Sequence, residues 1–170
     1  NIDVSAATAR GIPVGNTPGV LTDATADQAF ALMLSAARRI PEAERYVRAG
    51  KWGAWSPGLL LGADLVGSTL GVIGFGRIGQ AIAKRAQGFD MRVIYHGPNA
   101  SPAYGAQPVD LDTLLHESDF VSINVPLKPE TKHLINADFL AKMKPNAILV
   151  NTARGGVLDQ TALYDALKAH

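Results

Sequence analysis

Residues 69–89, TLGVIGFGRIGQAIAKRAQGF, constrain the fold of this chain more than any other stretch. An apolar segment typical of a buried strand leads into the glycine pattern GFGRIG. A helix is predicted over residues 78–89, because Ile78, Ile82 and Ala86 fall on one of its sides. A strand that turns through three glycines directly into a helix is typical of a nucleotide-binding βαβ unit.

The three glycines have different expected roles in such a turn. Gly74 permits the tight turn, Gly76 lets the backbone approach a pyrophosphate, and Gly79 lets the helix pack on the strand. The exposed amides and the helix dipole favour phosphates, and Arg77 is placed to reach them. We therefore predict a dinucleotide site. The alternative is a structural glycine turn that binds no ligand.

The remainder of the chain continues this alternation of strand and helix. Strands are predicted at residues 92–95, 120–125 and 147–152, and helices at residues 111–118, 136–143 and 158–170. Asp159 is a plausible N-cap for the last helix. Short apolar strands that alternate with helices predict an α/β fold, with a Rossmann-type, doubly wound parallel sheet covered on both faces.

The first third of the chain has a different pattern. Residues 11–19, GIPVGNTPG, suggest a short strand followed by a loop, and a helix begins near Thr22, with Thr22, Asp23 and Thr25 as competing N-caps. Pro41 is expected to end or kink this helix, and residues 51–58 form a loop. The apolar face of the helix is predicted to contain Ala26, Ala29, Phe30, Met33, Ala37 and Ile40.

Composition narrows the classes of function. Apolar residues make up 47% of the 170 residues and charged residues 18%, which is typical of a soluble globular protein. The net charge of +1 gives no reason to expect nucleic acid or a membrane surface as a partner. The chain has no cysteine, which excludes thiol catalysis and disulfides and fits a cytoplasmic location. No membrane span, signal peptide or metal site is expected.

The end of the second predicted strand lacks a residue that an NAD site normally has. An acid about 20 residues after the glycines would bind the ribose hydroxyls of NAD. Here His96, Gly97, Pro98 and Asn99 follow the strand, and no acid comes before Asp110. Nothing repels the 2′-phosphate of NADP, although no Arg or Lys follows the strand to bind it. We expect NADP or NAD, with NADP favoured; alternatively, His96 is simply an exposed turn residue.

The loop after the third strand, NVPLKPETKHLI, is expected to form a second wall of the cofactor site. Ligands of open α/β sheets bind beyond the carboxyl ends of the strands, which places Val125 and Pro126 near the nicotinamide half. Thr131 is a candidate hydrogen-bonding partner of the cofactor. His133 is a candidate acid catalyst, but a structural role in the loop is favoured.

The strand ILVN delivers Thr152, Ala153 and Arg154 to the same edge of the sheet. A guanidinium group matches a carboxylate in bidentate fashion, so Arg154 is a candidate for binding a 2-oxo acid. It is also placed to stabilise charge that develops on the carbonyl oxygen. The alternative is a surface residue that forms a salt bridge.

Five motifs in order then carry a resemblance that covers essentially the whole chain: NTPGVLTDATAD, LGVIGFGRIGQAIAKRAQGF, NVPLKPETKHLIN, MKPNAILVNTARGGVLD and ALYDAL. Together they resemble the D-isomer-specific 2-hydroxyacid dehydrogenases, most closely the glyoxylate/hydroxypyruvate reductases and 2-ketogluconate reductases. The resemblance implies hydride transfer between NAD(P)H and a small 2-oxo or 2-hydroxy acid, and a homodimer formed through the region of the linking helix. It also implies that residues 1–60 are the end of a first substrate-domain segment plus the interdomain helix. Residues 61–170 would then be a truncated dinucleotide-binding domain.

The resemblance also assigns roles to individual positions. Arg154 would bind and orient the substrate, while Thr152 and Ala153 would contact the nicotinamide side. Arg77 and Ile78 would lie at the pyrophosphate. The ribose end would lie at Gly97, Pro98 and Asn99, and Pro98 stands where NADP-preferring relatives often carry an Arg.

The catalytic His and its partner Glu of such enzymes are not found in these 170 residues. None of the four histidines, His96, His116, His133 and His170, lies in the corresponding motif. We therefore expect this chain alone to bind cofactor with little or no turnover, since the general acid is missing. The same fold also occurs in dinucleotide-sensing corepressors and in structural binding modules, which are the non-enzymatic alternatives.

Overall fold

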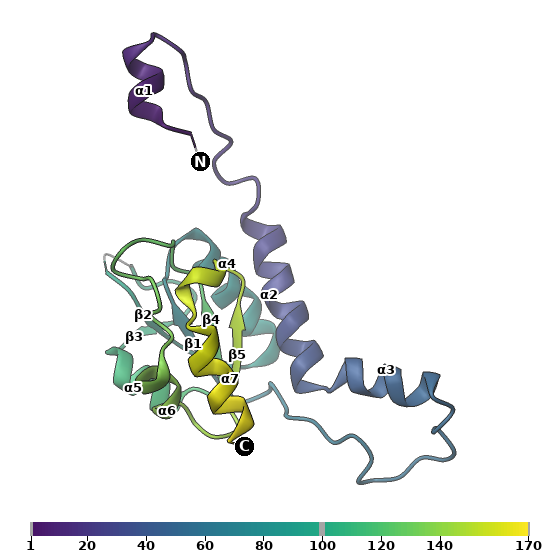
Figure 1. Ribbon diagram of the computed structural model, residues 1–170. Coiled ribbons are helices and arrows are strands. Elements are labelled where there is room, and N and C mark those ends of the chain that lie inside the picture. Colours follow the sequence, from purple (N-terminus) through teal and green to yellow (C-terminus); the bar gives the residue numbers. More distant parts are fainter. Residues whose placement is uncertain (1, 99–100, 170) are drawn as a thin grey trace.

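The computed structural model describes residues 2–98 and 101–169, and these form a parallel β-sheet flanked by helices (Figure 1). The described strands lie in the order β3-β2-β1-β4-β5, and every neighbouring pair is parallel. The strands are β1 (Thr69–Ile73), β2 (Arg92–His96), β3 (Gln107–Pro108), β4 (Phe120–Ile123) and β5 (Ile148–Asn151). The Rossmann-type prediction is confirmed, and strand order reverses between β1 and β4, where such folds bind ligands.

The helices connect and cover these strands. The α-helices are α1 (Val4–Ala9), α2 (Thr22–Ala37), α3 (Ile40–Arg48), α4 (Arg77–Ala86), α5 (Leu111–Glu117), α6 (Ala137–Ala141) and α7 (Gln160–Lys168). Two short 3₁₀ helices, η1 (Gln87–Phe89) and η2 (Gly155–Val157), complete the set in the described chain. The predicted helix over 78–89 is thus α4 continued by η1. In α7, Asp159 is the N-cap, and its carboxylate accepts hydrogen bonds from the backbone N–H groups of Thr161 and Ala162.

Two hydrophobic layers bury the two faces of the sheet. On one face, α2 and α4 cover strand residues that include Leu70, Val72, Val93, Tyr95, Phe120 and Val150. On the other face, α5 and α6 cover residues that include Ile73, Ile94, Val121 and Ile123. Because both faces are covered, the strands contain nearly continuous apolar runs, which is the pattern seen in the sequence.

Helix α2 packs against the same sheet as the glycine turn. Five of its six predicted apolar positions are buried, while Ile40 is 52% exposed. The reason is that α2 ends at Ala37, and Arg39, in a left-handed conformation (φ 52°), turns the chain into α3. The predicted N-caps are wrong, because Leu21 caps α2 with no side-chain hydrogen bond. Pro41 lies in the first turn of α3, where a missing N–H costs nothing.

An ion-pair cluster fastens α2 to α4. The Arg85 Nε atom lies 2.7 Å from an oxygen of Asp27, and one of its terminal nitrogens lies 3.2 Å from an oxygen of Asp23. The three alanines of the predicted apolar face of α2 (Ala26, Ala29 and Ala37) are buried in the layer shared with α4. These alanines therefore pack against α4 of the same chain.

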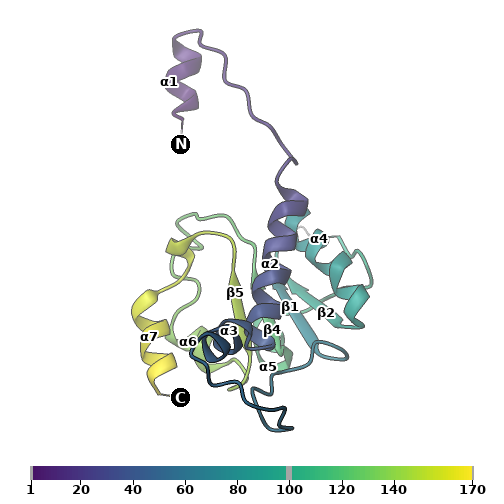
Figure 2. The ribbon, with the colours of Figure 1, turned by 90° about the vertical axis from the view of Figure 1, so that its right-hand side faces the viewer.

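Two elements differ from the sequence-based prediction. The short strand expected at the start of residues 11–19 does not form, and α1 precedes an extended arm in its place. Figures 1 and 2 show α1 and this arm standing away from the sheet. Ile12 and Val14 are exposed there, because no neighbouring strand pairs with the arm. Conversely, β3 was not predicted, since two residues are too few for an alternating pattern. No helix in the described residues is long and apolar enough to cross a membrane.

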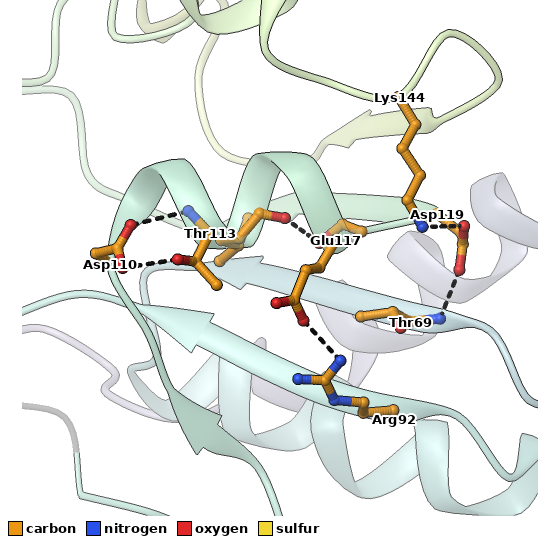
Figure 3. A network of polar contacts seen from close by, with 9 residues as sticks. Thr69, Arg92, Asp110, Thr113, Glu117, Asp119 and Lys144 are labelled. Carbon is orange, nitrogen blue, oxygen red and sulfur yellow. Dashed lines mark hydrogen bonds and ion pairs between the residues drawn. The ribbon is translucent and has the colours of Figure 1, made fainter.

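Polar contacts join the strands near their amino-terminal ends (Figure 3). One Asp119 oxygen accepts a hydrogen bond from the Thr69 backbone N–H at 2.8 Å, and the other lies 2.7 Å from the Lys144 Nζ atom. Burial alone would raise the pKa of Asp119, but the hydrogen bonds from Lys144 and Thr69 and the charge of Lys144 outweigh it and lower the pKa. Nearby, Arg92 pairs with Glu117 at 2.6 Å.

Replacing Asp119 with alanine is expected to reduce the free energy of unfolding by about 1 kcal/mol at neutral pH. One hydrogen bond to a backbone N–H is lost, and the half-exposed ion pair adds little. Because the folded-state pKa is lowered, this contribution is present above the unfolded pKa of about 4 and disappears as the pH falls through the folded value. Urea unfolding at pH 7 and pH 3 measures this, and an equal deficit for Asp119→Ala at both pH values would contradict it.

Candidate functional site

Three adjoining cavities lie along the edge of the sheet where β1 and β4 end. The His96 cavity (about 450 Å³) is lined by residues that include His96, Gly97 and Val125. The glycine-turn cavity (about 360 Å³) is lined by residues that include Gly76 and Arg77. The Arg154 cavity (about 640 Å³) is lined by Leu21, Thr25, Ile78, Asn124, Val125, Pro126, Leu127, Thr152, Ala153 and Arg154. Asn124 lines all three, so they adjoin one another and are together called the groove.

The glycine turn is held tightly at two of its three glycines. Gly74 has a φ of +88°, and its N–H donates to the His96 carbonyl oxygen at 2.8 Å. A Cβ atom on Gly74 would lie 2.8 Å from the Asn124 carbonyl group, and a Cβ on Gly79 would lie 2.4 Å from the Gly74 oxygen. The turn and the close helix packing predicted for these two positions are therefore present.

Gly76 is different, because the space beside it is open. A Cβ atom there would meet nothing within 4 Å, and Gly76 faces the glycine-turn cavity as the N-cap of α4. The first N–H groups of a helix have no partner within the helix, and no acidic side chain stands in the first turn of α4. Arg77 is exposed beside Gly19, with a guanidinium nitrogen 3.7 Å from the position of a Gly19 Cβ. This arrangement fits a pyrophosphate.

The His96 cavity has an uncharged wall where β2 ends. The His96 Nδ1 atom lies 3.2 Å from the Val109 carbonyl oxygen, which only accepts, so Nδ1 carries the proton of this hydrogen bond. A Cβ atom on Gly97 would lie at an ordinary contact distance of 3.6 Å from the Gly74 Cα atom, and Pro98 is exposed. Asn99 lies outside the described residues. The lining also includes Lys128 and Glu130 from the loop after β4, which the sequence-based prediction missed.

The loop after β4 is held by its own hydrogen bonds. The Thr131 hydroxyl donates to the Pro126 carbonyl oxygen at 2.6 Å and accepts from the Lys128 backbone N–H at 2.8 Å. Thr131 therefore fixes the cavity wall, and a direct bond to the cofactor stays a prediction. His133 is exposed, and its backbone N–H donates to the Gly156 carbonyl oxygen at 3.0 Å, which joins this loop to the one after β5.

The loop after β5 presents Arg154 to its cavity. The guanidinium group is exposed and donates to the Ala153 carbonyl oxygen at 2.8 Å; the described residues provide it with no acidic partner. The Asn151 side chain holds the turn, since it accepts from the Ala153 N–H at 3.0 Å and donates to the Arg154 carbonyl at 3.1 Å. Sequence reasoning missed Asn151, although it begins the motif NTARGG.

Two residues that line the Arg154 cavity each have a buried polar side-chain atom without a hydrogen-bond partner. Within the described residues, these are the Asn124 Oδ1 and Thr152 Oγ1 atoms. Buried polar groups are nearly always hydrogen-bonded, so a pair without partners indicates a ligand group that supplies them. An amide such as that of nicotinamide fits this donor and acceptor set. None of the described histidines lines this cavity.

Comparison with known proteins agrees with this arrangement. Residues 30–170 match the model of the D-isomer specific 2-hydroxyacid dehydrogenase, NAD binding domain. The glyoxylate reductase of Thermococcus litoralis is 58% identical over 176 residues, which cover 99% of this chain and 53% of that protein. The chain thus spans about half the length of the curated relatives it matches.

Solved structures give the same result. A protein from Thermus thermophilus superimposes with a TM-score of 0.95 at 53% identity, covering 98% of this chain and 53% of that one. An acyclic imino acid reductase in complex with NADPH and D-Arg has a TM-score of 0.89 at 34% identity, covering 99% of this chain and 54% of that one. The chain therefore belongs to the D-isomer-specific 2-hydroxyacid dehydrogenase family and contains that family's NAD-binding domain.

Proposed function

We propose that the protein to which this chain belongs transfers a hydride between NAD(P)H and a small 2-oxo acid of the glyoxylate, hydroxypyruvate or 2-ketogluconate type. One observation carries the proposal: Arg154 shares a cavity with the unpartnered Thr152 and Asn124 atoms, and this cavity continues into the glycine turn. The similarity to the glyoxylate reductase of T. litoralis supports the choice of substrate class. No observation on the described residues favours a sensing or purely structural module.

Different residues of this chain bind different parts of the cofactor. The first-turn amides of α4, with Gly76, Arg77 and Ile78, bind the pyrophosphate. Asn124 and Thr152 bind the nicotinamide amide, with Ala153, Val125 and Pro126 as the adjoining wall. When bound, NAD(P)H supplies the hydride.

Arg154 acts on the substrate. Its guanidinium group binds the carboxylate through two parallel hydrogen bonds, and it stabilises the negative charge that develops on the carbonyl oxygen. It already lies at the mouth of the cavity, on a turn that Asn151 fixes from both sides. The chain therefore supplies the orientation of the substrate, while none of its described histidines is placed to supply the proton.

NADP is the favoured cofactor. The wall formed by His96, Gly97 and Pro98 carries no carboxylate, so nothing there repels a 2′-phosphate. The imino acid reductase that binds NADPH has the same fold at 34% identity, which supports the proposal. We also propose that the complete protein forms a homodimer, that it is cytoplasmic and that a domain boundary lies near residue 60.

Replacing Arg154 with glutamine in the complete protein is expected to lower kcat/KM for glyoxylate by about 100- to 1000-fold, the usual cost of one lost charge-stabilising donor. The affinity for NADPH is expected to change less than about twofold, because the pyrophosphate and ribose contacts lie elsewhere in the groove. Steady-state kinetics with glyoxylate and hydroxypyruvate, and fluorescence titration with NADPH, measure both. Full activity of the variant would contradict the proposal.

A further inference from the structure

The charged groups of the His96 cavity lie on one wall only. Among the described residues that line this cavity, Lys128 is the only lysine or arginine and Glu130 the only acidic residue. Both come from the loop after β4, whereas the wall at the end of β2 offers His96, Gly97 and Pro98. Within the described lining, a side chain of fixed charge that recognises a charged group must therefore come from the loop.

The backbone of Lys128 is fixed at the rim of the cavity. Its N–H donates to the Thr131 hydroxyl at 2.8 Å. Its carbonyl oxygen accepts from the backbone N–H groups of Thr131 at 3.1 Å and Lys132 at 2.9 Å. Pro129 follows directly and restricts the chain further. The side chain thus starts from a constrained position, which reduces the entropy cost of holding its ammonium group over the groove.

The ion pair between the Lys128 ammonium group and Glu130 is weak. The Lys128 Nζ atom lies 3.6 Å from an oxygen of Glu130, and the two side chains are 57% and 67% exposed. Exposed ion pairs of this kind contribute little, so a stronger anion can take the place of Glu130. A phosphate dianion is such an anion, because it offers more charge and more acceptor oxygens than a carboxylate.

We infer that Lys128 is a specificity-determining residue, whose ammonium group binds the 2′-phosphate of NADP(H) in the cavity that Lys128 and Gly97 both line. The inference rests on the proposed function and deepens it. The wall at the end of β2 does not repel a 2′-phosphate, and Lys128 supplies the positive charge that binds it. NADH has hydroxyl groups at this end and gains no comparable charge interaction. Glu130 opposes the effect, because its carboxylate repels the phosphate and competes for Lys128.

The test is fluorescence titration of the 170-residue chain with NADPH and NADH separately. The wild-type chain is expected to bind NADPH more tightly. Lys128→Ala is expected to weaken NADPH binding about tenfold and to leave NADH binding within about twofold, because a charge-assisted contact to phosphate is removed. The matched control is Lys132→Ala, which removes an exposed lysine of the same loop that does not line the cavity.

Two further variants test the charge balance. Glu130→Gln is expected to tighten NADPH binding severalfold without affecting NADH. Gly97→Asp is expected to weaken NADPH selectively, since a side chain at Gly97 meets its neighbours at ordinary distances of 3.5 Å or more. The preference for NADPH should also decrease as ionic strength rises.

The outcomes separate the two proposals. If wild-type chain binds both dinucleotides and Lys128→Ala affects neither, or affects both equally, the role of Lys128 is refuted while the proposed function stands. If the folded wild-type chain binds neither dinucleotide, the proposed function and the inference both fail. A selective loss of NADPH affinity in Lys128→Ala, absent from Lys132→Ala, supports the inference.

Discussion

Replacing Gly79 with alanine is expected to lower the free energy of unfolding by about 2 kcal/mol, which corresponds to a decrease in Tm of about 4–8 °C for a chain of this length. The new Cβ atom would lie 2.4 Å from the Gly74 carbonyl oxygen and 3.1 Å from a methyl carbon of Val72. The Gly74 oxygen cannot easily move, because the φ of +88° and the hydrogen bond to His96 fix that residue. Alanine favours helices over glycine by about 1 kcal/mol at most, which is too little to offset the clash.

Thermal unfolding followed by circular dichroism measures this effect. Gly88→Ala is the matched control, since a Cβ atom at Gly88 meets nothing within 4 Å and its φ is not positive. We expect the Tm of the control to stay within about 2 °C of the wild-type value. A Gly79→Ala protein as stable as the Gly88→Ala protein would show that α4 does not pack on the turn as described.

Replacing Gly76 with alanine is expected to weaken dinucleotide binding about 10- to 100-fold while leaving stability nearly unchanged. The backbone of Gly76 (φ −78°, ψ −162°) suits any residue, and the space beside it is empty. A pyrophosphate must approach the backbone at this point, and an added methyl group would occupy that space. The predicted loss of affinity corresponds to an overpacking cost of about 1–3 kcal/mol.

The two glycine variants thus separate folding from binding. Gly79→Ala should lose stability first, whereas Gly76→Ala should keep its Tm and lose affinity. Titration of Gly76→Ala with NADPH, beside a thermal melt of the same sample, measures both properties. Unchanged NADPH affinity in this variant would place the phosphates elsewhere on the molecule.

The sequence predicted those parts of the fold that depend on local patterns. The glycine turn is one example, because its strand, its three glycines and its helix are contiguous. Asp159 is another, since an N-cap acts on amides two and three residues away. The short strand predicted at the start of residues 11–19 was wrong, because a local pattern does not show whether another strand lies beside it, and none does in the described part of the chain. Likewise, Ile40 continues the apolar pattern of α2 but lies beyond the turn at Arg39.

The candidate site was predicted in part. Gly76, Thr152 and Arg154 line the groove, as their positions at strand ends predicted. The missed residues depend on contacts between segments that are distant in sequence. Asn124 is one of them, because only the fold buries its side-chain oxygen without a hydrogen-bond partner. Lys128 lies in the motif NVPLKPETKHLI, and only the fold brings it into one cavity with Gly97.

Binding of a dinucleotide at the glycine-turn edge of the sheet is the property on which all of these proposals depend. Fluorescence titration of the folded wild-type chain with NADPH tests it most directly. We predict saturable binding with one site per chain, which NADP⁺ competes away and which is tighter than the binding of NADH. Absence of saturable binding by a chain that melts cooperatively would contradict the assignment of this edge as a dinucleotide site.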